Sequence, residues 1–253
     1  MKSKNADARN VDMSLLQTKP ALKLDWCSHE AAKYACERWH YSRCVPNQKT
    51  VKVGVWENEK FIGSVIFGDG ANGGMFAPYG LSQFQGCELV RVALKEHLTP
   101  VSRIVSIALR FLQKRCPSIR LIISFADPEH GHTGGIYQAG GWFYCGMSKA
   151  ADEYLVNGAR MHGRALRSTR STHKCKNVAS ANVFDWARKV LDPNIKKISG
   201  SSKHRYLMPL DEGMRLKIAP LAKPYPKRIR AASIDSDAPG FQSEEGSDVR
   251  TKC

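Results

Sequence analysis

The chain has 253 residues, and its hydrophobic fraction of 42% is enough to fill the core of a medium-sized domain. Lysine and arginine number 39 against 23 aspartates and glutamates, which gives a net charge of +16. No apolar run approaches the roughly 20 residues that a membrane span needs, and the polar start Met1–Asp7 is unlike a signal peptide. We therefore exclude a membrane protein and expect a protein of the cytoplasm.

The positive charge is unevenly distributed. Residues 231–253 hold five acidic and two basic residues, a net of −3, so residues 1–230 carry +19. A positive field of this size attracts polyanions, and nucleic acid is the most common of them. A soluble protein that is simply basic is the alternative. The eight cysteines include no C-x-x-C pair, so the sequence predicts no zinc ribbon.

The N-terminal half is predicted to begin with a flexible arm over residues 1–20. The elements expected next are a helix from a Ser28 cap to Trp39, a hairpin of strands 51–56 and 61–67, a glycine-rich loop 68–86 and a strand 88–94. The amphipathic run after Pro100 predicts a helix over 102–114, with Ser102 or Thr99 as its N-cap.

The C-terminal half opens with the apolar run 119–125, which is typical of a buried central strand. The elements expected after it are a short helix 135–139, a strand 142–145, a hairpin of 153–156 and 161–166 turning at Asn157-Gly158, a helix 177–191 and a strand 205–210. Residues 219–253 predict a disordered tail. The order predicts an α/β fold with a mixed sheet, in a domain over 21–218 whose last part, about 160–218, is basic.

The stretch Ile136-Tyr137-Gln138-Ala139-Gly140-Gly141-Trp142 follows the predicted buried strand. It resembles the GNAT acyltransferase pattern small-Leu-Tyr-x-x-x-Gly-Phe, which implies a GNAT-like mixed central sheet flanked by helices and a general-acid role for Tyr137. GNAT enzymes also use a glycine-rich loop to hold the pyrophosphate of coenzyme A. That loop is missing, because no glycine occurs between Gly86 and Gly131.

Five short motifs carry a closer resemblance: Trp39-His40-Tyr41-Ser42, Glu88-Leu89-Val90-Arg91-Val92, Ser124-Phe125-Ala126-Asp127, the 136–142 stretch, and Lys203-His204-Arg205-Tyr206. Together they resemble the Mom DNA-modification proteins of Mu-like phages. The resemblance implies an enzyme that converts adenine in phage DNA to N6-carbamoylmethyladenine inside the bacterial host, which blocks restriction nucleases. By position it implies a catalytic centre of His40, Tyr41, Asp127 and Tyr137.

The resemblance also implies that Arg91 and Ser102 lie near the donor, and the helix start at Ser102 and Arg103 is a candidate phosphate site. For the chemistry, adenine N6 must lose a proton as it attacks an acyl carbon. We expect His40 or Asp127 to accept that proton, since a base with a pKa of about 7 suits the step. Backbone amides of a splayed fourth strand near Arg91 are expected to bind the oxyanion.

The identity of the donor follows from the atoms of the family's product. A glycyl group supplies both carbons, the oxygen and the nitrogen of the carbamoylmethyl group, whereas an acetyl group supplies no nitrogen. We therefore favour glycyl-tRNA as the donor and keep acetyl-coenzyme A as the second candidate. Asp127, Glu129, His130 and His132 are four candidate ligands for iron or zinc, but a solvated loop is the favoured interpretation.

Contacts to double-stranded DNA are expected from the basic C-terminal part, and a solvated basic face is the alternative. The candidate nucleic-acid-binding residues are Arg164, Arg167, Arg170, Lys174, Lys176, Lys203, His204 and Arg205. A target adenine must be flipped out of the duplex. The candidates to stack on it are Trp39, Tyr41, Phe76 and Tyr79, and the 68–86 loop is a candidate to close over it.

Two other functions stay open at this point. One is a conventional GNAT acetyltransferase that acts on an amine or a protein with acetyl-coenzyme A. The other is a non-catalytic DNA-binding phage protein, for which His40, Asp127 and Tyr137 are dispensable and only the basic residues matter.

Overall fold

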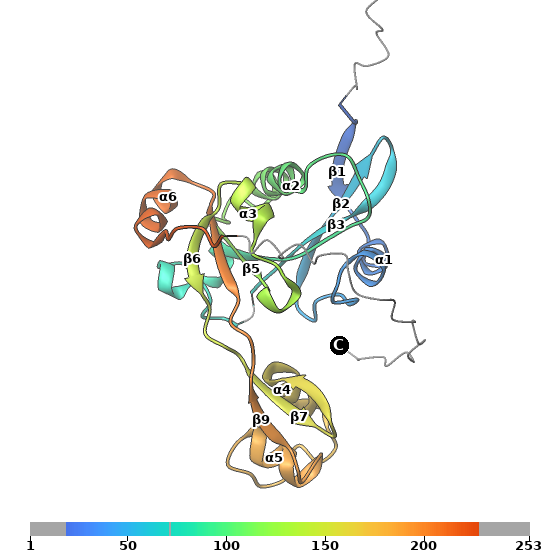
Figure 1. Ribbon diagram of the computed structural model, residues 1–253, viewed down its shortest axis with the longest axis vertical. Helices are drawn as coiled ribbons and strands as arrows, with labels where there is room; N and C mark the ends of the chain where they lie inside the picture. The colour runs from blue at the N-terminus through green and yellow to red at the C-terminus, as the bar shows by residue number, and fades with distance from the viewer. Residues whose placement is uncertain (1–18, 71, 228–253) are drawn as a thin grey trace, which may run out of the picture.

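The computed structural model describes residues 19–70 and 72–227 (Figure 1). Its main part is a seven-stranded mixed sheet in which only β4 and β5 pair in parallel. In spatial order the strands are β1 (Leu22–Trp26), β2 (Thr50–Glu57), β3 (Lys60–Gly68), β4 (Gly86–Leu94), β5 (Leu121–Ala126), β10 (His204–Pro209) and β6 (Phe143–Met147). The prediction of an α/β fold with a mixed central sheet flanked by helices is confirmed.

Helices cover both faces of this sheet, because successive strand residues point to opposite sides. On one face, α2 (Val101–Arg115) and α3 (Gly135–Ala139) pack against the larger core. On the other face, α1 (His29–Trp39) covers β3 and β4. There α6 (Glu212–Ile218) covers β5 and β10, together with part of segment 72–85. In these described ranges no helix is both long and apolar enough to cross a membrane.

Residues 148–203 form a separate lobe, inserted between the paired strands β6 and β10 and extending from one end of the main sheet (Figure 1). Its elements are β7 (Asp152–Val156), β8 (Ala159–His162), α4 (Gly163–Thr172), α5 (Val183–Val190) and β9 (Lys196–Ser199). The lobe has its own core, in which Tyr154, Leu166 and Trp186 are buried. Its two connections are bonded to each other, since the Ser148 amide donates to the Lys203 carbonyl at 2.8 Å.

Elements with a strong local pattern form where the sequence predicts them. The Ser28 hydroxyl accepts a hydrogen bond from the Ala31 amide (3.1 Å), as expected for the cap of α1. The hairpin β2–β3, the helix α3 and the hairpin turn after β7 also agree with the predictions. Asn157 and Gly158 have φ angles of 49° and 77°, the left-handed conformation that a two-residue hairpin turn requires.

The starts of three helices differ from the predictions, and the hydrogen bonds of the residues before each helix explain the differences. The N-cap of α2 is Pro100, since the Thr99 hydroxyl donates to Glu57 (2.6 Å) instead of capping the helix. Residues 163–166 begin α4 rather than extend a strand, because the ring of His162 accepts the Arg164 amide (3.1 Å). The helix expected from residue 177 starts only at Val183, where Asn182 caps it.

The first residues of the predicted tail are ordered against the main sheet. The Lys223 amide donates to the Tyr144 carbonyl, and the Tyr225 hydroxyl donates to the Trp142 carbonyl, both at 2.8 Å. The prediction of disorder over 219–227 was wrong. Composition could not reveal these contacts, because they use backbone carbonyls and a single tyrosine. The rest of the tail, residues 228–253, and residues 1–18 of the predicted arm lie outside the described residues.

Candidate active site

The candidate site lies where two neighbouring strands of the main sheet diverge. Gly86–Leu89 of β4 pairs with Leu121–Ser124 of β5, but β4 continues to Leu94 without β5 beside it. The pairing of β4 with β3 skips Val90 at the same point, which is a β-bulge. The diverging strands leave one edge of β4 without a strand partner, next to a cavity of about 970 Å³.

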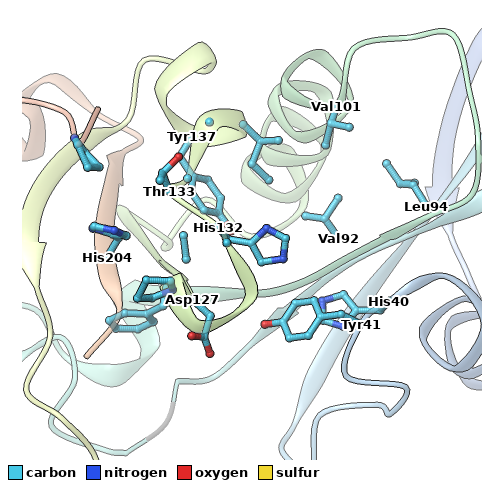
Figure 2. Close-up of a pocket in the computed structure, with 18 of the residues that line it drawn as sticks. His40, Tyr41, Val92, Leu94, Val101, Asp127, His132, Thr133, Tyr137 and His204 are labelled. Atoms are coloured by element: carbon cyan, nitrogen blue, oxygen red, sulfur yellow. The ribbon is translucent and has the colours of Figure 1, made fainter. Parts of the chain in front are cut away.

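The cavity is lined from both faces of the sheet, because the gap between β4 and β5 interrupts the layer (Figure 2). Val92, Val101 and Tyr137 line it on the side of α2 and α3. His40 and Tyr41, which follow α1 and share that side of the sheet with it, line the cavity from the opposite side. The two faces of the sheet thus contribute side chains to one cavity.

His40 is buried and has a fixed tautomer. The Ser42 amide donates to Nδ1 of His40 (3.1 Å), and because an amide only donates, the proton of the neutral ring is on Nε2. Burial, together with the charges of Arg91, His132 and His130, lowers the pKa of His40 to about 3. His40 thus presents an N–H donor, which differs from the base with a pKa of about 7 that we expected.

Tyr41 lies in a cluster of aromatic rings at the cavity. Its ring centroid is 4.3 Å from that of His40, 4.4 Å from that of His130 and 5.3 Å from that of His132. Although these rings surround it, Tyr41 remains 47% exposed. The cluster therefore offers an exposed aromatic surface to a planar ligand.

The four aromatic candidates for base stacking lie in two different places, two at the cavity and two in the core. Trp39 and Tyr41 line the cavity. Phe76 and Tyr79 are buried in the core under β5 and β10. Segment 72–85 therefore packs under β5 and β10 and does not line the cavity, in contrast to our expectation that it closes over a base.

Asp127 follows β5 and is buried in an ion pair. Its Oδ2 lies 2.8 Å from Lys203 Nζ, and its side chain also caps the next turn by accepting the Glu129 amide (3.1 Å). Burial alone would raise the pKa of Asp127, but the bonds to Lys203 and Glu129 hold it below the usual range. Asp127 is consequently an ionised hydrogen-bond acceptor at neutral pH.

Tyr137 is buried in α3, and its hydroxyl reaches the gap between the strands. Ser124 Oγ lies 2.8 Å from both the Tyr137 hydroxyl and the Leu89 carbonyl. Serine has one proton and a carbonyl only accepts, so Ser124 donates to Leu89 and Tyr137 donates to Ser124. Burial raises the pKa of Tyr137 to about 12, which keeps its hydroxyl protonated.

None of the three predicted donor residues lines the cavity. Arg91 is on the α1 side, where its charge acts on His40 and Cys36, and its Nε has no hydrogen-bond partner. Ser102 and Arg103 are in the first turn of α2, next to Val101 of the cavity wall. Neither of them, nor Arg91, lines the cavity itself.

The loop before α2 is anchored by a buried carboxylate. Glu57 accepts the amides of Leu98 (2.9 Å) and Thr99 (2.8 Å) and the Thr99 hydroxyl. Burial opposes ionisation, but these bonds hold the pKa of Glu57 below its usual range. Two amides of this loop, those of Leu98 and Thr99, are thus already bound to an anion.

The predicted nucleic-acid-binding residues fall into two groups. Arg164, Arg167 and Arg170 recur every three residues along α4 of the lobe, followed by Lys174 and Lys176 in the next turn.

The second group is at the main sheet instead. Lys203 pairs with Asp127, and Nδ1 of His204 lies 3.1 Å from the Tyr144 hydroxyl at the cavity. Arg205 donates to the Cys145 carbonyl (3.0 Å). These three side chains therefore have partners in the main sheet, unlike the lobe residues.

The motif analysis did not single out Glu88 as a site residue. Burial raises the pKa of this carboxyl group, although the charges of Arg164, Arg91 and Lys203 oppose that shift. The charge of Lys203 thus acts on two carboxyl groups, those of Asp127 and Glu88, and the charge of Arg164 in the lobe acts on Glu88. A carboxyl group in the mostly apolar strand 86–94, three residues before Arg91, is the signal that could have found it.

The four candidate metal ligands after β5 do not form a metal-binding group. His130 Nδ1 is 3.6 Å from Asp127 Oδ2, and Glu129 instead lies 3.5 Å from Arg160 of the lobe. Within the described ranges, no group of three or more His, Cys, Asp or Glu side chains is placed to hold a metal ion.

The fold and cavity define an α/β protein with a ligand-sized site between splayed strands of a mixed sheet. Residues 21–227 match the Mom protein family. The chain belongs to this family, as its motifs predicted.

Two solved structures are similar at low identity, and no curated protein sequence matches. One is FeeM, an N-acyl amino acid synthase from uncultured soil microbes, with 11% identity, TM-score 0.42 and coverage of 79% of this chain and 97% of that chain. The other is aminoglycoside acetyltransferase AAC(6')-Ib in complex with coenzyme A and kanamycin, with 12% identity, TM-score 0.40 and coverage of 59% and 99%. Neither similarity is strong enough to assign an activity.

Proposed function

We propose that this protein is a transferase that modifies adenine N6 in DNA with a glycine-derived group, giving N6-carbamoylmethyladenine and protecting phage DNA from restriction. The observation that carries the proposal is the convergence of three family motifs on one cavity. The motifs 39–42, 124–127 and 136–142 are far apart in the sequence, yet all three line the space beside the splayed strands.

The side chains around the cavity suit attack on an acyl carbon. Asp127 accepts a hydrogen bond from the N6 amino group and takes its proton, which becomes acidic once N6 bonds to the carbonyl carbon. His40 Nε2–H and the free edge of β4 donate to the oxyanion. Tyr137 supplies a proton to the alkoxide leaving group. Its raised pKa suits this step, because the hydroxyl group that forms is a similarly weak acid.

Glycyl-tRNA is the donor we favour, and the anchored loop before α2 supports this choice. Glu57 occupies amides that a coenzyme A enzyme leaves free for phosphate, and its negative charge repels a pyrophosphate. A donor held through its nucleic-acid part does not need that loop. Acetyl-coenzyme A remains the second candidate.

The product follows from glycyl transfer without a redox step. N6 displaces the ribose oxygen of the tRNA ester, giving N6-glycyladenine and deacylated tRNA. The free glycyl amine then attacks C6 through a five-membered ring, and the original C6–N6 bond breaks. The former amine nitrogen remains on C6 and carries the CH₂–CO–NH₂ group, so every heavy atom of the glycyl group is retained.

Double-stranded DNA is the proposed acceptor, held by the lobe. Arg164, Arg167 and Arg170 form no ion pair in the part of the chain that the structure describes. Arg167 and Arg170 are therefore available to phosphates, and Arg164 continues the row toward Glu88 of the main sheet. A flipped adenine enters on the side of Tyr41, whose exposed ring suits stacking.

Nucleoside mass spectrometry on DNA from expressing cells tests the function, with Asp127→Ala as the control. We expect deoxyadenosine heavier by one glycine residue, absent in the control. Purified protein is then assayed with glycyl-tRNA and, separately, with acetyl-coenzyme A and ammonia. Modification by the second mixture without tRNA contradicts the donor. An acetyl-sized gain indicates a conventional acetyltransferase, and unmodified adenine with folded protein indicates a DNA-binding protein.

A further inference from the structure

A second basic surface lies on α2, on the opposite side of the cavity from the lobe. Arg103, Arg110 and Lys114 are exposed and are spaced seven and four residues apart, which places them on one line of the helix. The buried side chains of α2, among them Ala108 and Leu112, are on the opposite side of the helix.

The charge of this line has no local explanation. α2 contains no acidic residue, and none of the three side chains forms an ion pair within the described residues. Lys114 at the C-terminal end complements the helix dipole, but Arg103 is in the first turn, where the dipole disfavours a cation. Helix stability therefore does not account for Arg103.

The position of the line links it to the cavity. Val101, the first residue of α2, lines the cavity on the face opposite to His40 and Tyr41. From there the line from Arg103 to Lys114 runs about 16 Å along the helix, long enough to meet several phosphates of a polyanion.

We infer that the protein binds two nucleic acids at once, DNA on the lobe at one end of the sheet and the RNA part of the donor on α2. This inference rests on the proposed function. DNA on the lobe reaches the cavity from the Asp127 side, and the acylated end of the RNA enters from the Val101 side. The acceptor and donor then meet in the gap between β4 and β5 without competing for one surface.

Two matched triple variants of the full chain test the inference, each removing three charges: R103Q/R110Q/K114Q on α2 and R164Q/R167Q/R170Q on α4. The probes are a fluorescent deacylated glycine tRNA transcript and a fluorescent DNA duplex, measured by anisotropy over a series of salt concentrations. All six side chains are on helix surfaces, and thermal melts verify that both variants are folded.

We expect the α2 variant to bind the tRNA about tenfold or more weakly, with a salt slope smaller by about 3, while DNA affinity stays within about twofold. The α4 variant should show the reverse, and excess unlabelled duplex should not displace tRNA from the wild type. The inference is overturned if the wild type does not bind tRNA, if the duplex displaces it, or if tRNA affinity follows the α4 variant. Glycyl transfer by an α2 variant with normal tRNA affinity overturns this inference alone, whereas modification with acetyl-coenzyme A without tRNA overturns the proposed donor.

Discussion

His40 shows how one backbone contact decides the chemistry of a side chain. Ser42 occupies Nδ1 through its amide, so the ring offers only Nε2–H to the cavity. A neutral imidazole with its proton on Nε2 is a hydrogen-bond donor at that atom. Such a donor suits the stabilisation of developing negative charge.

The lowered pKa of His40 makes stability depend on pH in one direction. Its folded pKa is about 3 and its ordinary value is 6.5, so the stability that the neutral ring provides is present above 6.5 and is lost as pH falls toward 3. We expect His40→Asn, whose side-chain oxygen can still accept from Ser42, to reduce this loss. Thermal melts of both proteins between pH 7 and 4 measure the difference, and parallel curves would contradict the prediction.

Lys203 sets the acidity of Asp127 and therefore the pH range of activity. Lys203→Met removes the 2.8 Å ion pair, so the pKa of Asp127 should rise and the acid limb of the pH–rate profile should move to higher pH. Lys197→Met, which removes an exposed pair with Asp152, is the control. An unchanged acid limb would show that Asp127 does not titrate in the reaction.

Tyr137 combines a structural bond with a proposed proton-donating role, and the phenylalanine variant separates them. Tyr137→Phe keeps the buried ring, while Ser124 still donates to the Leu89 carbonyl. We expect about 1 kcal/mol of lost stability and a fall in transfer rate of about 100-fold or more. Denaturant melts and single-turnover assays give the two numbers, and a rate close to wild type would remove Tyr137 from the chemistry.

At the scale of elements, the short helix α3 depends on one glycine. Gly134 has φ of +82°, and a Cβ there would lie 2.3 Å from the ring of Tyr206. We expect Gly134→Ala to cost more than the roughly 1–3 kcal/mol of a left-handed residue, because it adds this clash, and to misplace Tyr137. Gly158→Ala, with φ of +77° and no atom within 4 Å of its Cβ, is the matched control in denaturant melts. Equal losses in both variants would exclude the clash.

Periodicity and caps predicted the elements whose sequence is strongly patterned, such as α1, β5 and α3. The strand β1 was missed because its apolar alternation spans only five residues. The strand β9 and the helices α4 and α6 were missed because they are short or rich in polar and basic residues, and tertiary contacts determine their conformation. The motifs identified His40, Asp127 and Tyr137 as site residues. Their chemical states depend on Ser42, Lys203 and Ser124, whose contacts appear only after folding.

At the scale of the whole molecule, the lobe and the main sheet have separate cores. Leu166 is fully buried among lobe residues only. We expect Leu166→Ala to destabilise the lobe by about 2–5 kcal/mol and to weaken DNA binding, with the main sheet intact. Calorimetry should show a lower-temperature transition that moves and a second that does not. A single transition that moves as a whole would contradict separate cores.

The lobe leaves and rejoins the main sheet at two neighbouring strands, and its two connections are hydrogen-bonded to each other. Its replacement by a different folded segment therefore requires no change in the order or register of the other strands. If the lobe binds DNA as proposed, related chains can differ in the DNA they recognise while they keep the same reaction, because separate segments of the gene encode the two properties.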